Sequence, residues 1–184
     1  LIRLDLEKLS GKQKICSNVY LPKGNGETSE ADIIFIHETG LYIIESKYYS
    51  GRIKVNEEYK EWTQYLGRRG INKFFNPILQ NKTHIKCAKK LLESRGIKVD
   101  DKDICSVVIF GETSDLDKVI CRDDLILDTE GSLYLKLRDR FKDKKKVFSE
   151  NAITKIYNIF NEYCNVSEEI KNKHVQDVIR RRGR

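Results

Sequence analysis

The sequence predicts an α/β protein in which a mixed sheet is flanked by helices. Three observations lead to this class: two β-rich apolar runs joined by a short turn at residues 33–44, a helical pattern that begins at Asn76 and Pro77, and a continuous apolar run at residues 104–110. The chain has 184 residues, of which 39% are hydrophobic and 34% are charged. One domain with a buried core is therefore expected.

The N-terminal elements follow in order along the chain. We expect a helix to about residue 9, a strand at residues 15–21 and a hairpin whose turn lies at residues 37–40. A strand at residues 52–55 and a second hairpin, with arms at residues 59–66 and 71–75, would extend the same sheet. Asn76 as N-cap, with Pro77 at the first helical position, predicts a helix to about residue 94 that Gly96 would close. Residues 104–110 then give a fully buried strand.

The C-terminal third is predicted to be helical. Helices are expected at residues 132–141 and 149–164, each opened by a serine, and Ser167 would cap a last helix that ends in arginines. This pattern divides the chain into a core at residues 1–125 and a helical extension at residues 126–184, which packs on the core and carries a basic tail.

Three charged residues interrupt the apolar hairpin: Asp32, Glu45 and Lys47. Ionised groups rarely lie among Ile and Phe side chains without a compensating partner. If Ile36 pairs with Leu41, Asp32 falls opposite Glu45 with Cβ atoms about 4.5–5.5 Å apart. Lys47 then shares their face, because side chains alternate along a strand. A register shifted by one residue would instead send Glu45 and Lys47 to the opposite face.

Two carboxylates and a lysine at one end of a sheet suit a divalent metal ion and a phosphate. Mg²⁺ or Mn²⁺ takes hard oxygen ligands, which here would be Asp32, Glu45 and the backbone carbonyl of Ser46. Such an ion polarises a phosphoryl oxygen and lowers the pKa of a water nucleophile. Lys47 would position that water and stabilise the developing charge. The alternative is an ordinary ion pair of Lys47 with Asp32 or Glu45.

Asp32 followed by Glu45-Ser46-Lys47 resembles the PD-(D/E)xK nuclease superfamily. The flanking run GLYIIESKYYSGRI at residues 40–53, the later run FNPILQNKTHI at residues 75–85 and Trp62 between them are similar to the NERD (nuclease-related) domain. The resemblance covers roughly residues 1–120. It implies a restriction-endonuclease-like core with the element order αβββαβ.

For activity, the resemblance implies a Mg²⁺- or Mn²⁺-dependent nuclease that hydrolyses DNA phosphodiester bonds. It assigns Gln80 to the site beside Asp32, Glu45 and Lys47. The family also opens with a Gly-Glu pair on its first helix, whereas this chain begins inside that helix, so we expect the N-terminus to lie upstream. The alternatives are a non-catalytic nucleic-acid-binding module that keeps the fold, and a structural or protein-interaction domain.

The formal charge of +7 suits a polyanionic partner such as DNA. Five basic residues on the strands and hairpin that follow the Glu-Ser-Lys motif, interleaved with aromatic residues, are expected to contact it: Arg52, Lys54, Arg68, Arg69 and Lys73. Gln80 and His84 are four residues apart on one helix face with Asn81 beside them, so Asn81 and His84 would add contacts. The alternative for these two residues is the polar side of an amphipathic helix.

The cysteine content and the hydropathy of the sequence indicate the cellular compartment. The five cysteines are odd in number and form no CxxC pair, which predicts reduced thiols and a cytoplasmic protein. No Cys or His pair has the spacing of a zinc site. Apolar runs are too short for a membrane span. These patterns leave the oligomeric state open.

Overall fold

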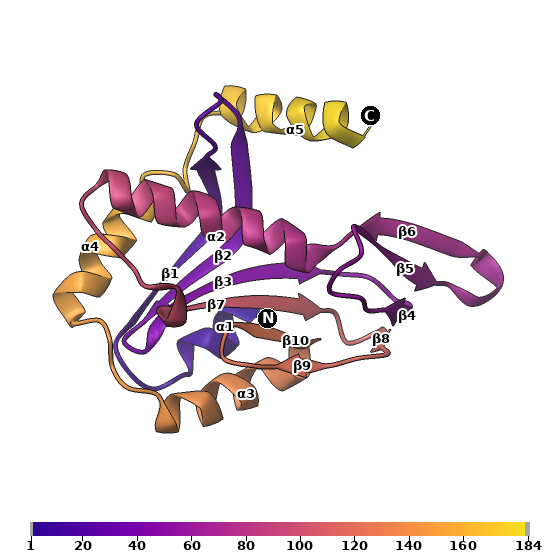
Figure 1. Ribbon diagram of the computed structural model, residues 1–184, viewed down its shortest axis with the longest axis horizontal. Coiled ribbons are helices and arrows are strands. Elements are labelled where there is room, and N and C mark those ends of the chain that lie inside the picture. The colour runs from indigo at the N-terminus through magenta and orange to yellow at the C-terminus, as the bar shows by residue number, and fades with distance from the viewer. Residues whose placement is uncertain (1, 183–184) are drawn as a thin grey trace.

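The structure, a computed structural model, describes the backbone of residues 2–182 and the side chains of residues 2–180. Its centre is a six-stranded sheet (Figure 1). The strands lie in the order β1 (Gln13–Pro22), β2 (Thr28–His37), β3 (Gly40–Lys47), β7 (Ile104–Phe110), β10 (Leu125–Thr129) and β9 (Ile120–Cys121). β1, β2 and β3 are antiparallel neighbours, whereas β3, β7 and β10 are parallel. The predicted α/β class with a mixed sheet is confirmed.

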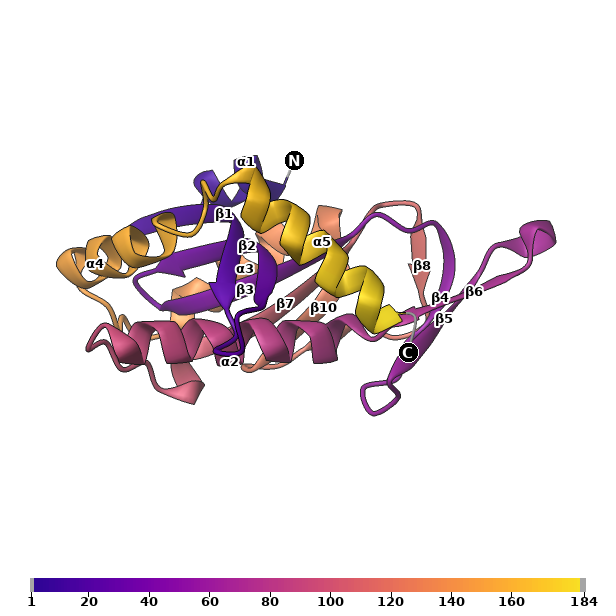
Figure 2. The ribbon, with the colours of Figure 1, turned by 90° about the horizontal axis from the view of Figure 1, so that it is seen from above.

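Helices cover both faces of this sheet (Figures 1 and 2). Two pack on each face: α2 (Pro77–Ser94) and α4 (Glu150–Asn161) on one, α1 (Ile2–Glu7) and α3 (Glu130–Asp143) on the other. Ile43 belongs to the core beneath the first pair and Ile44 to the core beneath the second. Because side chains alternate along β3, Glu45 and Lys47 share the face of Ile43, which is the face that α2 covers.

Asn76 begins α2 and ties it to a neighbouring loop. Its Oδ1 atom accepts hydrogen bonds from the backbone nitrogens of Ile78 at 2.9 Å and Leu79 at 3.4 Å, which confirms the predicted N-cap. Its Nδ2 atom donates to three carbonyl oxygens of the loop at residues 56–59. The role of Asn76 is therefore structural, because every polar atom of its side chain holds backbone.

A second sheet begins at Gly51, four residues after Lys47. It has the order β6 (Ile71–Phe75), β5 (Glu61–Tyr65), β4 (Gly51–Lys54) and β8 (Ser114–Leu116), and the 3-10 helix η1 (Gly67–Arg69) forms the tip of its β5–β6 hairpin. The expectation that these strands extend the central sheet is wrong. Gly51 has a φ of +76°, and a Cβ atom there would overlap the carbonyl of Tyr65. Glycine alone fits this turn, where the chain leaves the first sheet for the second.

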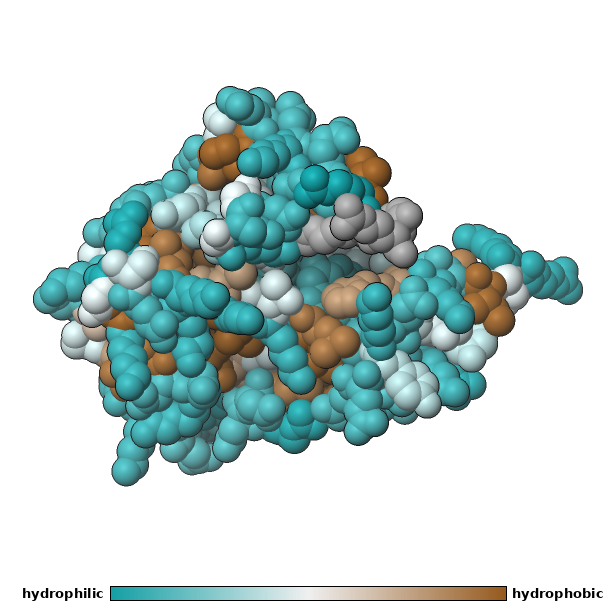
Figure 3. Space-filling view, turned by 45° about the horizontal axis from the view of Figure 1, so that its top comes forward, coloured by the Kyte–Doolittle hydropathy of each residue, from teal (hydrophilic) through white to brown (hydrophobic). Residues whose placement is uncertain are grey.

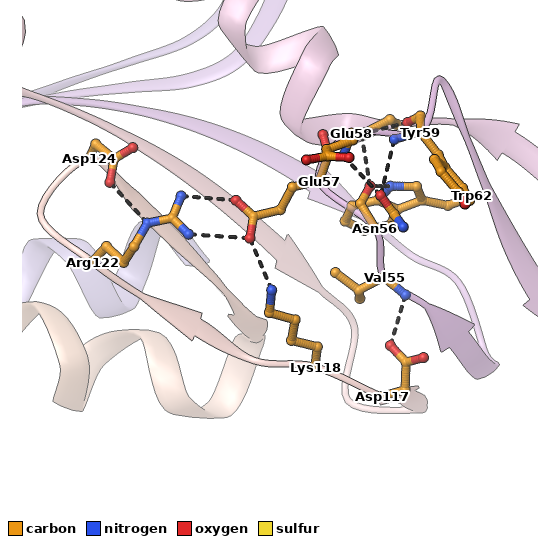
Figure 4. A network of polar contacts seen from close by, with 11 residues as sticks. Val55, Asn56, Glu57, Glu58, Tyr59, Trp62, Asp117, Lys118, Arg122 and Asp124 are labelled. Atoms are coloured by element: carbon orange, nitrogen blue, oxygen red, sulfur yellow. Dashed lines mark hydrogen bonds and ion pairs between the residues drawn. The ribbon is translucent and has the colours of Figure 1, made fainter.

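An aromatic core fixes the second sheet to the end of β7. Trp62 stacks on Phe110 with ring centroids 6.2 Å apart, and both rings contact Phe74. In the loop that leads into β5, Glu57 accepts two hydrogen bonds from Arg122, at 3.2 and 2.9 Å (Figure 4). The base of the β5–β6 hairpin is therefore held by aromatic packing and by this ion pair, while its tip projects from the body of the molecule (Figure 1).

The C-terminal part departs from the prediction in three places. β10 continues the central sheet to Thr129, so the expected boundary at residue 125 falls at the start of a sheet strand. α3 begins at Glu130, and the expected cap at Ser132 is wrong because the Ser132 hydroxyl donates to the carbonyl of Thr129. The short strands β8 and β9, and the 3-10 helix η2 (Asp101–Asp103), are absent from the predicted order.

The last two helices begin as predicted. Ser149 accepts a hydrogen bond from the backbone nitrogen of Ala152, and Ser167 opens α5 (Glu168–Arg182) by accepting from the backbone nitrogen of Ile170. α5 lies against the tip of the β1–β2 hairpin (Figures 1 and 2), where Arg180 pairs with Glu27 at 2.9 Å. The side chains of the arginines that follow residue 180 lie outside the described residues.

Candidate active site

The β2–β3 hairpin has the register that the sequence predicts. Ile33 pairs with Ile44, so the next positions along the two strands are Asp32 and Glu45, opposite each other. The Oδ2 atom of Asp32 accepts a hydrogen bond from the backbone nitrogen of Ser46 at 2.7 Å. This hydrogen bond holds the Asp32 side chain against β3, next to Glu45.

Glu45 is the centre of a network of charged and polar side chains. It is only 1% exposed. The Lys47 Nζ atom donates to its Oε1 atom at 2.5 Å, and the His84 Nε2 atom lies 3.1 Å from its Oε2 atom. Lys47 also donates to the Oε1 atom of Gln80 at 3.1 Å. Gln80 and His84 are one turn apart on α2, so the predicted face of this helix meets the predicted face of the sheet.

Ser29 joins this network, although the sequence does not predict it. Its Oγ atom lies 2.8 Å from the Nδ1 atom of His84, so the imidazole bridges Ser29 and Glu45. Strict alternation along β2 would place Ser29 on the face opposite Asp32. The pairing of β1 with β2 is interrupted at Asn18, which has a φ of +51°, and the alternation breaks there. No sequence pattern signals this break.

The two carboxyl groups lie in unequal environments. Burial alone would raise the pKa of Glu45, but the hydrogen bond with His84 and the charge of Lys47 outweigh it and hold the pKa below its ordinary value. Burial, followed by the neighbouring charge of Glu45, raises the pKa of Asp32 to about 6. Asp32 therefore carries the less compensated charge of the pair.

This set of donors suits a hard divalent cation. Two carboxylates close together repel each other, and a cation beside them would relieve this repulsion, which together with burial raises the pKa of Asp32. Within the described part of the chain, no three His, Cys, Asp or Glu side chains are grouped as metal ligands. Asp32 and Glu45 would therefore leave the other positions to water, phosphate and a backbone carbonyl, which is how Mg²⁺ is commonly bound. Both Glu45 oxygens have partners in the structure, so a cation would have to share or displace the contact with Lys47.

Asn81 and His84 lie too deep for the direct DNA contacts expected of them. Asn81 is fully buried, and its Nδ2 atom donates to the carbonyl oxygens of Ile43 at 2.7 Å and Val107 at 3.3 Å and to the Ser106 hydroxyl at 2.9 Å. It ties α2 to β3 and β7 behind the site. His84 is buried, and both of its ring nitrogens are engaged. Both residues therefore support the site from inside.

The predicted basic residues lie on the second sheet, apart from the network around Glu45. Arg52 and Lys54 project from β4 and Lys73 from β6, and the other two arginines form the η1 tip. All five side chains are exposed, and none forms an ion pair with another described residue. The structure thus groups them on one element but does not bring them to the carboxylates.

Three further observations concern residues elsewhere. Glu7, an acidic residue of the first helix, lies away from the site, because it pairs with Arg3 at 3.0 Å on α1, which packs on the opposite face of the sheet. All five cysteines are free thiols. Across residues 2–182, every helix is too short or too polar to cross a membrane.

Comparisons with known proteins identify the family of the N-terminal part of the chain. The family described as nuclease-related domain, NERD, matches residues 2–111, which is more than half of the chain. The uncharacterized protein pXO1-01 of Bacillus anthracis is 36% identical over 96 residues. These residues are 52% of this chain and 45% of that protein, so the match spans less than half of the relative's length. No solved structure matches the chain.

Proposed function

The chain belongs to the NERD, or nuclease-related domain, family, and we propose that it is a metal-dependent nuclease that hydrolyses DNA phosphodiester bonds. The observation that carries this proposal is the convergence of Glu45 and Lys47 with Gln80 of α2, beside a second carboxylate at Asp32. Phosphodiester hydrolysis needs a cation at the phosphate, a positioned water and a positive group near the developing charge. In this proposal the carboxylates would hold the cation, and Lys47 would position the water and supply the positive group, all within one partly buried network.

Each residue has a separate role in this proposal. Asp32, Glu45 and the backbone carbonyl of Ser46 would hold Mg²⁺ or Mn²⁺, which supplies Lewis-acid activation of the phosphate and of a water. Lys47 donates to Glu45 and Gln80, and an attacking water or a phosphate oxygen can take one of these hydrogen bonds. Gln80 positions the Lys47 amine from the side of α2.

A non-catalytic nucleic-acid-binding module is the second candidate. The observation that favours it is that Lys47 and His84 already satisfy both oxygens of Glu45 as an internal network. In that case the basic second sheet would bind nucleic acid, and the buried charges would only stabilise the fold. Binding would then be independent of Mg²⁺ and Mn²⁺.

Plasmid cleavage at increasing Mn²⁺ or Mg²⁺ concentrations separates the two candidates. The wild-type chain should cleave in a metal-dependent way, and Lys47→Ala should lose about a hundredfold or more in rate because it removes the positive group at the phosphate. Lys90→Ala changes an exposed lysine of α2 remote from the network and is the matched control. Absence of metal-dependent cleavage by wild type, or equal rates for wild type and Lys47→Ala in folded protein, would exclude the nuclease.

A further inference from the structure

In the part of the chain that the structure describes, the most exposed aromatic side chains lie in one region. Among the exposed large hydrophobic side chains of the described residues, four are aromatic: Tyr48, Tyr59, Tyr65 and Phe75. All four lie on the second sheet or on the segments that lead into its strands. The central sheet, by contrast, buries its aromatic rings between helices, as at Phe35. The second sheet is therefore built to leave aromatic surface open.

Cross-strand pairing gathers aromatic and basic side chains on one face of this sheet. Arg52 of β4 pairs with Tyr65 of β5, which in turn pairs with Ile71 of β6. Ile71, Lys73 and Phe75 occupy alternate positions of β6 and so share this face, about 6.5–7 Å from one to the next. Tyr65 is 39% exposed and Phe75 is 45% exposed. The projecting hairpin shows hydrophobic side chains next to a hydrophilic tip (Figure 3).

The charge on this face is predominantly positive. Three exposed cations lie on it, Arg52, Lys54 and Lys73, and the adjoining tip adds Arg68 and Arg69; none of the five is paired with another described residue. Two exposed acidic residues accompany them: Glu61 and Asp115. Unpaired cations next to open rings match a ligand that carries both negative charge and flat apolar surfaces.

We propose that this face binds a single-stranded segment of nucleic acid. Unstacked bases can lie on Tyr65 and Phe75 while their phosphates meet Arg52 and Lys73. A duplex keeps its base planes stacked inside, so it would offer the face phosphates and groove edges but no open base plane for Tyr65 or Phe75. A protein partner would gain from the apolar side chains but would leave the cations without counterions, because charged residues are depleted at the centre of protein interfaces.

The second sheet begins close to the network around Glu45, and we infer from this that the strand bound on its face is the substrate. β4 starts four residues after Lys47, which limits the distance between the Lys47 and Gly51 Cα atoms to about 14 Å. A strand bound next to Arg52 therefore lies near the end of β3, where Lys47 is. The role of the bound strand as substrate rests on the proposed nuclease function, and it adds that the enzyme acts on single-stranded nucleic acid.

Fluorescence anisotropy in EDTA tests binding without cleavage, using a dye-labelled 20-nucleotide thymidine strand and a labelled 20-base-pair duplex. The wild-type chain should bind the single strand more tightly than the duplex. Tyr65→Ala and Phe75→Ala should each weaken binding of the single strand by about tenfold and leave duplex binding nearly unchanged. Tyr65→Phe keeps the ring and should bind as the wild type does. Leu135→Ala removes an exposed apolar side chain from α3 and is the matched control.

The outcomes separate this inference from the nuclease proposal. Unchanged single-strand binding by Tyr65→Ala and Phe75→Ala, or an equal loss for both nucleic acids, overturns the inference, whatever the cleavage assay gives. Tighter wild-type binding of the duplex overturns it as well. A selective loss of single-strand binding in a chain that never cleaves DNA keeps the single-strand binding face but rejects the nuclease, and with it the role of the bound strand as substrate. Circular dichroism melting of each variant confirms that these exposed substitutions leave the fold intact.

Discussion

Among the described residues, charged side chains are paired in the network around Glu45 and unpaired on the exposed face and tip of the second sheet. In the network around Glu45 the charged side chains are buried or half-buried, and hydrogen bonds no longer than 3.1 Å join them to one another. On the second sheet five cations are exposed, and no described residue pairs with them. A buried charge without a partner is costly, whereas an exposed charge stays hydrated and available. Substitutions in the network should therefore change folding and metal affinity, and those on the sheet should change only binding.

The largest effect on stability is expected for Asn81→Ala, behind the network. The substitution leaves the buried carbonyls of Ile43 and Val107 without this donor and opens a small cavity. We expect the free energy of unfolding to fall by about 3 kcal/mol. Urea unfolding followed by circular dichroism measures it, with the exposed neighbour substitution Lys82→Ala as control. Equal stability of the two variants would contradict the structural role assigned to Asn81.

Asp32→Asn should stabilise the metal-free protein while removing a proposed metal ligand. Folding raises the pKa of Asp32 from its ordinary 3.8 to about 6, so the ionised carboxylate destabilises the folded state, and this cost appears as the pH rises through that window. The amide carries no charge and can still accept from Ser46. We expect a gain of about 1–2 kcal/mol at pH 8 that nearly vanishes at pH 4, since a full shift of this size is worth about 3 kcal/mol and Asp32 is partly exposed.

Urea unfolding at both pH values in EDTA measures this gain. Asp115→Asn, on the exposed face of the second sheet, is the control and should change the free energy of unfolding by less than about 0.5 kcal/mol at either pH. Added Mn²⁺ should stabilise the wild type and not Asp32→Asn. A loss of stability in Asp32→Asn at pH 8 would mean that Asp32 is already compensated without a metal ion.

The two regions also differ in how far the sequence predicts them. The register that sets Asp32 against Glu45 follows from alternation and turn length, and the start of α2 follows from Asn76 and Pro77, because both signals lie within one element. The sheet that the strands after Gly51 join could not be predicted in this way. It depends on the turn at Gly51 and on packing against Trp62, so a local pattern predicts the strands but not the strands with which they pair. Ser29 was missed for a related reason, because the distortion at Asn18 lies on the neighbouring strand.

Ser29→Ala should weaken metal binding without removing a ligand. The hydroxyl holds Nδ1 of His84, whose other nitrogen holds Glu45, so its loss frees the carboxylate to reorient. We expect the Mn²⁺ dissociation constant to rise about three- to tenfold, measured by electron paramagnetic resonance of free Mn²⁺. Ser29→Thr keeps the hydroxyl and should restore most of the affinity. If Thr and Ala behave alike, the effect comes from packing and not from the hydrogen bond.

The smallest effect is expected at the tip of the second sheet. Arg68→Ala and Arg69→Ala should each lower the slope of log affinity for single-stranded DNA against log salt by about 0.7, and reduce the affinity itself only a few-fold, because each removes one phosphate contact. Unfolding should be unchanged, since neither side chain has a described partner. Arg95→Ala, whose side chain pairs with Glu162, is the control and should leave the slope unchanged. An unchanged slope for both tip variants, with a reduced slope for Arg52→Ala, would place the nucleic acid along the base of the sheet, nearer to Lys47.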